Sequence, residues 1–501
     1  MRRNISLIGI LLLLFLNACS KSNEPPKETL VVALASEPKT LDPRFATDAN
    51  GMRISSLIFN SLVKIGPQLE VIGDAAQSWE IKGNTFLFKL HPNISFSNGR
   101  KVEKEDILYS FQQFQSKDCP FQSAFNEIKN LEVNVEEDSF IIKVEMNKFS
   151  AKFISSDLPV LKILPKKELE AQPDEFTKRP FGTGSYKLVE FNTNSILLEK
   201  NLNNPLLQPS SKMIQFKVIR DDFTRYQKML NGEVDISQSE IPLEKVKNFE
   251  KKKDQFNIYK YPGLSFTYLL LNLEDPIIKK FQARRAIAHA INRREIIDFK
   301  LEGYALPATS ILTPANPFYN SKLEPIPFAL QKAKELIHDL NSNNIELTLK
   351  TSNTPSAVDV GKVIVNHLAN AGVKANLQSY EWGTFYGDIT KGNFQMATMR
   401  WVGAIDPDIY RVALHSSEVP PGRNRGHYKN KRLDELLENG LAIKDIDKRI
   451  KHYQEVQKIV LDELPIIPLW YNQQVAIVNK RVKNYEPAMN GDFSPLLKAH
   501  K

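Results

Sequence analysis

The sequence predicts a water-soluble α/β protein built from two or three domains. Strand-like runs alternate with amphipathic helical segments along the chain, which is the pattern of α/β domains. The chain has 501 residues, whereas one domain usually holds about 100 to 200. With 42% hydrophobic and 25% charged residues, the composition is that of a globular protein that can bury several cores.

The first residues are expected to be a targeting segment. Arg2 and Arg3 precede an apolar run, Ile5–Leu16, which is shorter than the roughly 20 residues of a membrane span. The following Leu16-Asn17-Ala18-Cys19-Ser20 resembles a lipobox. We therefore expect a lipoprotein signal peptide over residues 1–18, lipidation of Cys19 and a flexible tether over 19–28. An ordinary secretory peptide with an incidental cysteine is the alternative.

Several strands are expected after the tether. Phe86, Phe88 and Leu90 alternate with less apolar neighbours, which favours a strand with a buried aromatic face. Asn98-Gly99 favours a tight turn, and the acidic residues within 103–106 favour the start of a helix. The other expected strands are Leu30–Ala35, Ile196–Lys200, Ile214–Arg220 and Ile345–Thr351.

Helices are expected where apolar residues recur three or four positions apart. Gly372 follows the second of three such stripes and is expected to cap its C-terminus. The stripes are Ala283, Ala286, Ile287, Ala290 and Ile291; Val363, Ile364, Leu368 and Ala371; and Ile450, Tyr453, Val456, Ile459 and Val460.

The net charge is +9, from 67 basic and 58 acidic residues. A basic excess can indicate a nucleic-acid-binding protein. Here the basic residues are spread along the chain, and short clusters such as Lys251-Lys252-Lys253 are typical of solvated surface. We therefore expect no nucleic-acid partner.

Eight ordered segments carry a resemblance to one family. They are Pro38–Pro43, Leu57–Val63, Ala75–Glu80, Trp79–Phe111, Pro180–Tyr186, Tyr268–Asn272, Arg284–Arg293 and Trp401–Asp408. In this order they resemble the family 5 extracytoplasmic solute-binding proteins, the peptide and nickel receptors of ABC importers. The match spans about the whole mature chain.

The resemblance implies a two-lobed periplasmic binding protein fold with an extra domain on the first lobe. Lobe I would comprise residues 29–62, 181–265 and 478–501, with 63–180 as the added domain and 266–477 as lobe II. The chain would cross between the lobes near Tyr261–Phe266 and Ala476–Lys480, and the cleft would close by hinge motion.

The resemblance also implies a function. The chain would be a monomeric receptor in the periplasmic space, lipid-anchored to a bacterial membrane. It would capture peptides, expected to be oligopeptides or modified peptides, and deliver them to ABC permease subunits. No cofactor, metal site or catalytic residue is implied.

The ligand-binding residues are carried over from matching positions. Trp382 and Trp401 align with tryptophans that line the peptide pocket, and the planar guanidinium of Arg400 suits a carboxylate. The segment Ala46–Gly51 matches a loop whose backbone pairs with an extended peptide. The expected ligand-binding residues are Thr47, Asp48, Ala49, Asn50, Tyr268, Trp382, Arg400, Trp401, Val402, Ala404 and Asp406. In the alternative, the tryptophans fill the core and the segment is an ordinary surface loop.

One departure from the family pattern concerns the ligand. Peptide receptors often carry an Asp three residues beyond the pocket tryptophan, where it pairs with the ligand's ammonium group, and here that position is Ala404. Either Asp406 replaces the missing anion, or the ligand has no free amino terminus, because an unpaired buried ammonium is unfavourable.

Motifs of enzymes are scarce. The nearest approach to a nucleophile elbow is Gly263–Thr267, which lacks the final glycine, so Ser265 is expected to be a strand residue. His452 and Glu455 form a lone HxxE without a second zinc ligand nearby. Besides the peptide receptor, we keep two hypotheses: the same fold binding a nickel chelate, haem or a cell-wall peptide, and an extracytoplasmic hydrolase.

Overall fold

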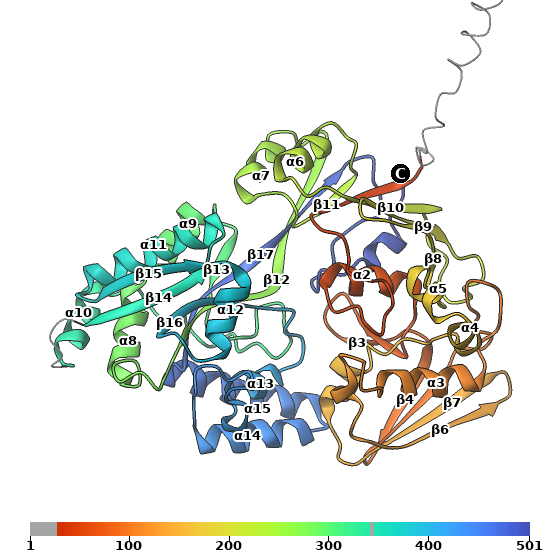
Figure 1. Cartoon of the computed structure of the whole chain (residues 1–501), viewed down its shortest axis with the longest axis horizontal. Helices are drawn as coiled ribbons and strands as arrows, with labels where there is room; N and C mark the ends of the chain where they lie inside the picture. The colour runs from red at the N-terminus through yellow and green to blue at the C-terminus, as the bar shows by residue number, and fades with distance from the viewer. Residues whose placement is uncertain (1–27, 341–344) are drawn as a thin grey trace, which may run out of the picture.

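The protein has two α/β lobes joined by two long strands (Figure 1). The computed structural model describes residues 28–340 and 345–501. The expected signal peptide, Cys19 and all of the tether except Glu28 lie outside the described residues. The joining strands are β12 (Phe256–Leu271) and β17 (Ile466–Asn479), which are antiparallel partners. The expected two-lobed α/β fold is confirmed.

One eleven-stranded sheet passes through both lobes in the order β15-β14-β16-β12-β17-β11-β1-β10-β9-β8, with β13 paired to β17. In the first lobe the strands are β1 (Leu30–Leu34), β8 (Tyr186–Phe191), β9 (Ser195–Lys200), β10 (Met213–Val218) and β11 (Ile236–Gln238). In the second they are β13 (Ala305–Pro307), β14 (Glu346–Ser352), β15 (Lys374–Tyr380) and β16 (Met396–Val402). The strands β1, β9, β10 and β14 correspond to the four predicted strands that begin with Leu30–Ala35. Their ends agree with the prediction within one or two residues.

Helices cover the sheet of each lobe. The first lobe contains α2 (Ala49–Ile58), α6 (Asp222–Leu230) and α7 (Leu243–Glu250). The second contains α8 (Phe281–Ala290), α9 (Arg293–Lys300), α10 (Leu330–His338), α11 (Pro355–Asn370), α12 (Trp382–Thr390), α13 (Ile409–Leu414), α14 (Lys431–Ala442) and α15 (Ile446–Glu463). The three predicted helical stripes lie on α8, α11 and α15, and Gly372 has a positive φ of 90° just beyond α11.

Two hydrophobic cores lie on opposite faces of the second lobe's sheet. Leu269 and Leu349 belong to the core that includes residues of α8 and α11. Tyr268 and Met399 belong to the core that includes residues of α12 and α15. This division follows from the alternation of side chains along a strand, and it decides which site residues can lie together.

The stretch from Trp79 to Phe111 lies in a separate four-stranded sheet with the order β4-β5-β7-β6. Its strands are β4 (Ala76–Lys82), β5 (Thr85–Leu90), β6 (Ile128–Glu136) and β7 (Ser139–Met146), and the helix α3 (Lys104–Phe114) packs nearby (Figure 1). Phe86, Phe88 and Leu90 are fully buried. Glu103 and Asp106 form a capping box at the start of α3. The predicted strand, turn and helix are therefore confirmed.

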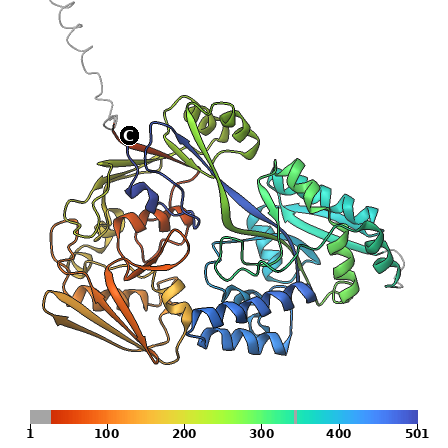
Figure 2. The same cartoon turned by 180° about the vertical axis from the view of Figure 1, so that it is seen from behind.

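Shorter elements complete the chain. They are β2 (Val63–Ile65), β3 (Val71–Gly73), α4 (Lys166–Ala171), α5 (Pro173–Lys178) and the short helical turns η1 (Gln122–Ala124), η2 (Phe153–Asp157), η3 (Ser416–Glu418) and η4 (Ser494–Leu497). Figure 2 shows from behind that α14 and α15 lie beside the part of the chain that contains the four-stranded sheet. Within the described residues, no helix combines the length and apolarity needed to cross a membrane.

Candidate functional site

The carboxyl ends of the parallel strands of both lobes converge on the middle of the β12–β17 pair. β11 ends at Gln238, opposite Ala476, while β16 ends at Val402, opposite Ser265, which itself faces Asn472. Ala476 and Asn472 are four residues apart on β17, which is about 13 Å along a strand. Ligands of open α/β sheets bind outside such carboxyl ends. We define the candidate ligand site as this region and the residues on its two borders.

On the first lobe, the border includes the start of α2. Asp48 is the N-cap, and its Oδ1 accepts a hydrogen bond from the Gly51 N–H at 2.8 Å. The buried Asn50 donates its Nδ2–H to the carbonyl of Ser36 at 2.9 Å, which ties the helix to the end of β1. Thr47 and Ala49 are exposed.

The prediction of a loop over Ala46–Gly51 is wrong for its second half. Residues from Ala49 onward are helical because Asp48 caps the helix and Ile54, Leu57 and Ile58 bury its apolar face. In a helix the backbone N–H and C=O groups form hydrogen bonds within the same segment, whereas in a strand they point sideways toward a neighbouring strand. Ala49 and Asn50 therefore cannot pair with an extended peptide as an added strand, although their side chains still border the site.

On the second lobe, the two predicted tryptophans have different environments. Trp382 is the first residue of α12, beside the N-cap Glu381, and is 56% exposed. Trp401 is partly buried against the core that contains Tyr268. Tyr268 is itself buried, and burial raises its pKa. Trp382 is therefore available to a ligand, whereas Trp401 and Tyr268 also serve the core.

Arg400 and Trp401 point to opposite faces of the sheet because they are successive residues of β16. Arg400 lies opposite Thr267 and Trp401 opposite Phe266 on β12. Val402, on the Arg400 face at the strand end, is 67% exposed.

Arg400 is a cation without an anion. Its side chain is exposed, yet the protein around it removes enough water to lower its pKa. The two observations agree if the guanidinium lies in a recess that solvent still reaches. No carboxylate within the described residues lies within ion-pair distance of it. Arg400 is thus free to pair with an anionic ligand group.

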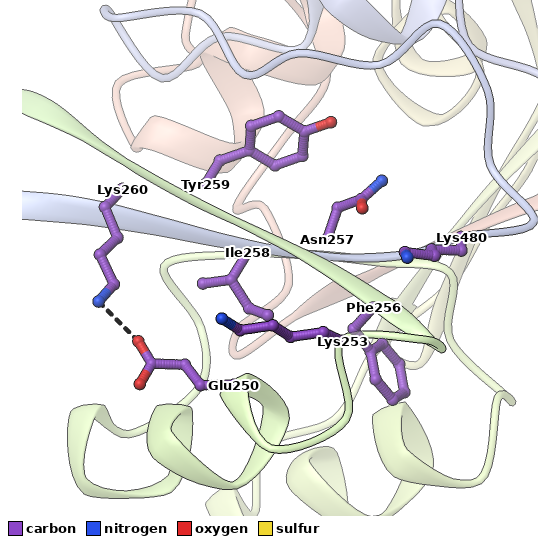
Figure 3. Close-up of a pocket in the computed structure, with 8 residues that line it drawn as sticks. All are labelled: Glu250, Lys253, Phe256, Asn257, Ile258, Tyr259, Lys260 and Lys480. Carbon is purple, nitrogen blue, oxygen red and sulfur yellow. Dashed lines mark ion pairs between the residues drawn. The ribbon is translucent and has the colours of Figure 1, made fainter.

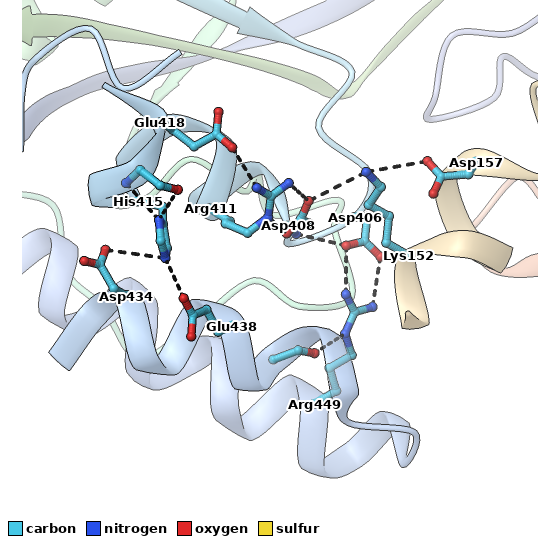
Figure 4. A network of polar contacts seen from close by, with 12 residues as sticks. Lys152, Asp157, Asp406, Asp408, Arg411, His415, Glu418, Asp434, Glu438 and Arg449 are labelled. Atoms are coloured by element: carbon cyan, nitrogen blue, oxygen red, sulfur yellow. Dashed lines mark hydrogen bonds and ion pairs between the residues drawn. The ribbon is translucent and has the colours of Figure 1, made fainter. Parts of the chain in front are cut away.

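Asp406 is fully engaged by the protein, so it does not replace the missing anion at position 404 (Figure 4). Arg449 donates to both carboxylate oxygens at 2.9 and 2.8 Å. Ser155 donates its hydroxyl at 2.6 Å and the Asp408 N–H donates at 2.9 Å. A carboxylate has about four acceptor positions, and these four donors occupy them. The side chain of Ala404 is a methyl group, and its carbonyl accepts a hydrogen bond from Asn316 at 3.1 Å.

Two residues that the sequence did not indicate, Tyr386 and Arg425, extend in turn from Trp382. Tyr386 stacks on Trp382 with ring centroids 5.6 Å apart. Arg425 donates from Nη2 to the Tyr386 hydroxyl at 2.6 Å. Tyr386 could have been found from its position four residues after Trp382 on one helix face. Arg425 could not, because it is 39 residues from Tyr386 in the chain.

A surface hollow lies toward the start of β12. It has a volume of about 690 Å³ and is lined by Glu250, Lys253, Phe256, Asn257, Ile258, Tyr259, Lys260 and Lys480 (Figure 3). Its strand residues extend from Phe256 to Lys260 of β12, and only Tyr259 and Lys260 lie in the stretch of β12 that pairs with Asn472–Ala476 of β17. Lys260 forms an ion pair with Glu250 at 2.6 Å. This open surface hollow is not the site that the converging strands define.

Comparisons with known proteins agree with this architecture. The family profile described as bacterial extracellular solute-binding proteins, family 5 Middle, matches residues 70–419. The chain is 24% identical to the dipeptide-binding protein of Escherichia coli (strain K12) over 528 residues, covering 97% of each chain. It is 25% identical to heme-binding protein A of Haemophilus influenzae over 506 residues, covering 93% of this chain and 91% of the relative.

A solved structure gives the same result. It is the ABC transporter-associated periplasmic binding protein of Helicobacter pylori in complex with the peptide STSA, with a TM-score of 0.78 and 25% identity over 94% of this chain and 98% of that one. The profile match covers more than half of the sequence. The chain therefore belongs to the bacterial extracellular solute-binding proteins of family 5.

Proposed function

We propose that this chain captures peptides, oligopeptides in particular, between its two lobes and delivers them to the permease of an ABC importer. The observation that supports this most is the convergence of both sheet edges on the same short stretch of β12 and β17, with Gln238 on one side and Val402 on the other. A ligand in that position touches both lobes at once.

Such a ligand stabilises the arrangement in which the lobes are close together. It has more contacts in the closed form than in the open form, so binding shifts the population toward closure. The strands β12 and β17 are the connections about which the lobes would move, and the lobe limits given from the sequence are part of this proposal. The permease would then recognise the closed shape.

Within the site, we assign the exposed residues to the ligand. Trp382 would pack against an apolar or planar part of it, and Arg400 would pair with a carboxylate. Thr47 and Ala49 would border the ligand from the first lobe. Trp401 would support the site from the core side.

The remaining parts of the proposal concern location. The chain acts outside the cytoplasmic membrane, as a monomer tethered through a lipid on Cys19. Expression in bacteria with and without an inhibitor of lipoprotein signal peptidase tests the anchor. The processed, lipidated form differs in mass from the precursor. Retention of the intact precursor under both conditions contradicts the anchor.

A second ligand class is favoured by one observation, the similarity to heme-binding protein A of Haemophilus influenzae over 93% of this chain. Haem carries two carboxylates, which suit a guanidinium such as that of Arg400, and a planar ring, which suits an aromatic side chain such as that of Trp382. Nickel chelates and cell-wall peptides are further members of this class. Titration with haem, monitored by its absorption spectrum, separates this candidate from peptide.

Calorimetry with a pool of random tri- to pentapeptides tests the proposed function. We expect saturable binding that Trp382→Ala weakens about 10-fold or more, since a large aromatic contact is lost. Phe299→Ala is the matched control because Phe299 is 76% exposed on α9, outside the site. Absence of binding by the unmodified chain would refute the proposal, and recovery of cleaved peptides would favour the hydrolase instead.

A further inference from the structure

We infer that Arg425, together with Tyr386 and Trp382, forms a subsite that binds a carboxylate group of the ligand. The inference rests on the proposed function and deepens it, because it defines the class of ligand. It implies that a free carboxylate anchors the ligand on the second lobe, in place of the ammonium group that an acidic residue at position 404 would have held.

Arg425 differs from the other buried arginines in its hydrogen bonds. The described residues include six buried arginines: Arg44, Arg225, Arg284, Arg293, Arg425 and Arg449. Each of the other five donates three or more hydrogen bonds to carboxylates, backbone carbonyls or an amide oxygen. Arg425 donates one, to the hydroxyl of Tyr386.

A second donor of Arg425 is buried without an acceptor. Its Nε is buried and has no hydrogen-bond partner among the described residues. The guanidinium carbon lies 4.8 Å from the centroid of the Tyr386 ring, which compensates part of the charge. A phenol hydroxyl is neutral, however, and a buried cation is unfavourable unless an anion completes its hydrogen bonds. The planar fork of a guanidinium matches a carboxylate.

Arg425 lies next to exposed residues of the ligand site. The side chain is 7% exposed, and it lies against Tyr386, which is 37% exposed. Tyr386 in turn stacks on Trp382, which is 56% exposed at the carboxyl edge of the sheet. A ligand that packs on the two rings would bring a carboxylate to the guanidinium along the edge of Tyr386.

The carboxylates of the neighbouring elements are already occupied. Asp406 is held by Arg449, and Asp388, on the same helix as Tyr386, is held by Lys350 at 2.7 Å. Glu381 caps α12 through the Gly383 N–H at 2.7 Å. Arg400 and Arg425 have no carboxylate partner among the described residues, whereas these three nearby acids have protein partners. This charge distribution favours an acidic ligand.

The test compares three forms of one random tripeptide pool by calorimetry: unmodified, N-acetylated and C-terminally amidated. We expect the acetylated pool to bind about as well as the unmodified pool. We expect the amidated pool to bind about 10- to 100-fold more weakly, since a charge-assisted hydrogen bond is lost. Arg425→Met should produce a similar loss with the unmodified pool and abolish the difference between the unmodified and amidated pools.

Arg423→Met is the matched control, because Arg423 is exposed in the same loop. Equal binding of the amidated and unmodified pools to the unmodified chain would overturn the inference and leave the proposed function intact. Failure of all three pools to bind would instead count against the proposed function. The comparison of pools requires no variant, so a folding defect of Arg425→Met, detected by circular dichroism, does not obscure the result.

Discussion

Replacing Asp406 by Asn tests whether this residue holds the fold or the ligand. Asn keeps the size of the side chain and removes its charge. Arg449, which is 3% exposed, would then be a buried cation without an anion, although Gly440 still accepts one of its hydrogen bonds. Breaking a buried ion pair by removing one partner costs about 3–5 kcal/mol. We expect a loss of this size in the free energy of unfolding.

Urea unfolding monitored by tryptophan fluorescence measures this loss. Asp447→Asn is the matched control, since Asp447 is exposed on α15, the helix that carries Arg449, and lacks an ion-pair partner among the described residues. We expect that control to change stability by less than about 0.5 kcal/mol. Unchanged stability of Asp406→Asn, together with loss of peptide binding, would show that the carboxylate serves the ligand and would refute the structural role.

Three further predictions concern packing and charge in the N-terminal half of the chain. Phe86→Ala should destabilise the protein by about 3–5 kcal/mol in urea unfolding, because the ring is fully buried between neighbouring aromatic rings; a loss below about 1 kcal/mol would contradict this packing. Gly184→Ala should lower the unfolding free energy by about 1–3 kcal/mol, since a Cβ there would lie 2.4 Å from the carbonyl oxygen of Leu57; unchanged stability would show that the backbone yields easily. Burial, opposed by Lys152 and reinforced by the charges of Asp406 and Asp408, raises the pKa of Asp157 to about 7. The folded state therefore prefers the protonated carboxyl, and its stability should fall as pH rises from the ordinary pKa near 4 through 7, by about 1.4 kcal/mol per unit of pKa shift. Asp157→Asn should flatten this dependence between pH 4 and 8, and an unaltered pH profile would contradict the assignment.

The secondary structure could be predicted where side-chain periodicity is strong. The alternation around Phe86 and Phe88 and the stripe that contains Tyr453 both describe elements whose buried faces are clear in the sequence. The start of α2 was missed although its signals were present. Asp48 stands before apolar residues at helical spacing, which is the pattern of an N-cap, but the expected loop took precedence over it.

The site could be predicted only in part, because its decisive contacts join distant parts of the chain. Asp406 binds Arg449, 43 residues away, and Ser155, 251 residues away. The acceptors of Arg425 likewise depend on tertiary packing. Trp382 was assigned to the site through the family resemblance, and its 56% exposure agrees with that proposal. Whether a nearby charge is satisfied by the protein or left for a ligand requires the three-dimensional structure.

Native mass spectrometry of the purified protein mixed with the random peptide pool tests the central claim most directly. We predict protein ions that carry one intact peptide each, and loss of that peptide when Trp382→Ala and Arg400→Met are combined. Circular dichroism of the double variant confirms that it is folded. Protein ions without bound peptide, or equal retention by the folded double variant, would contradict the proposal that these residues capture peptides between the two lobes.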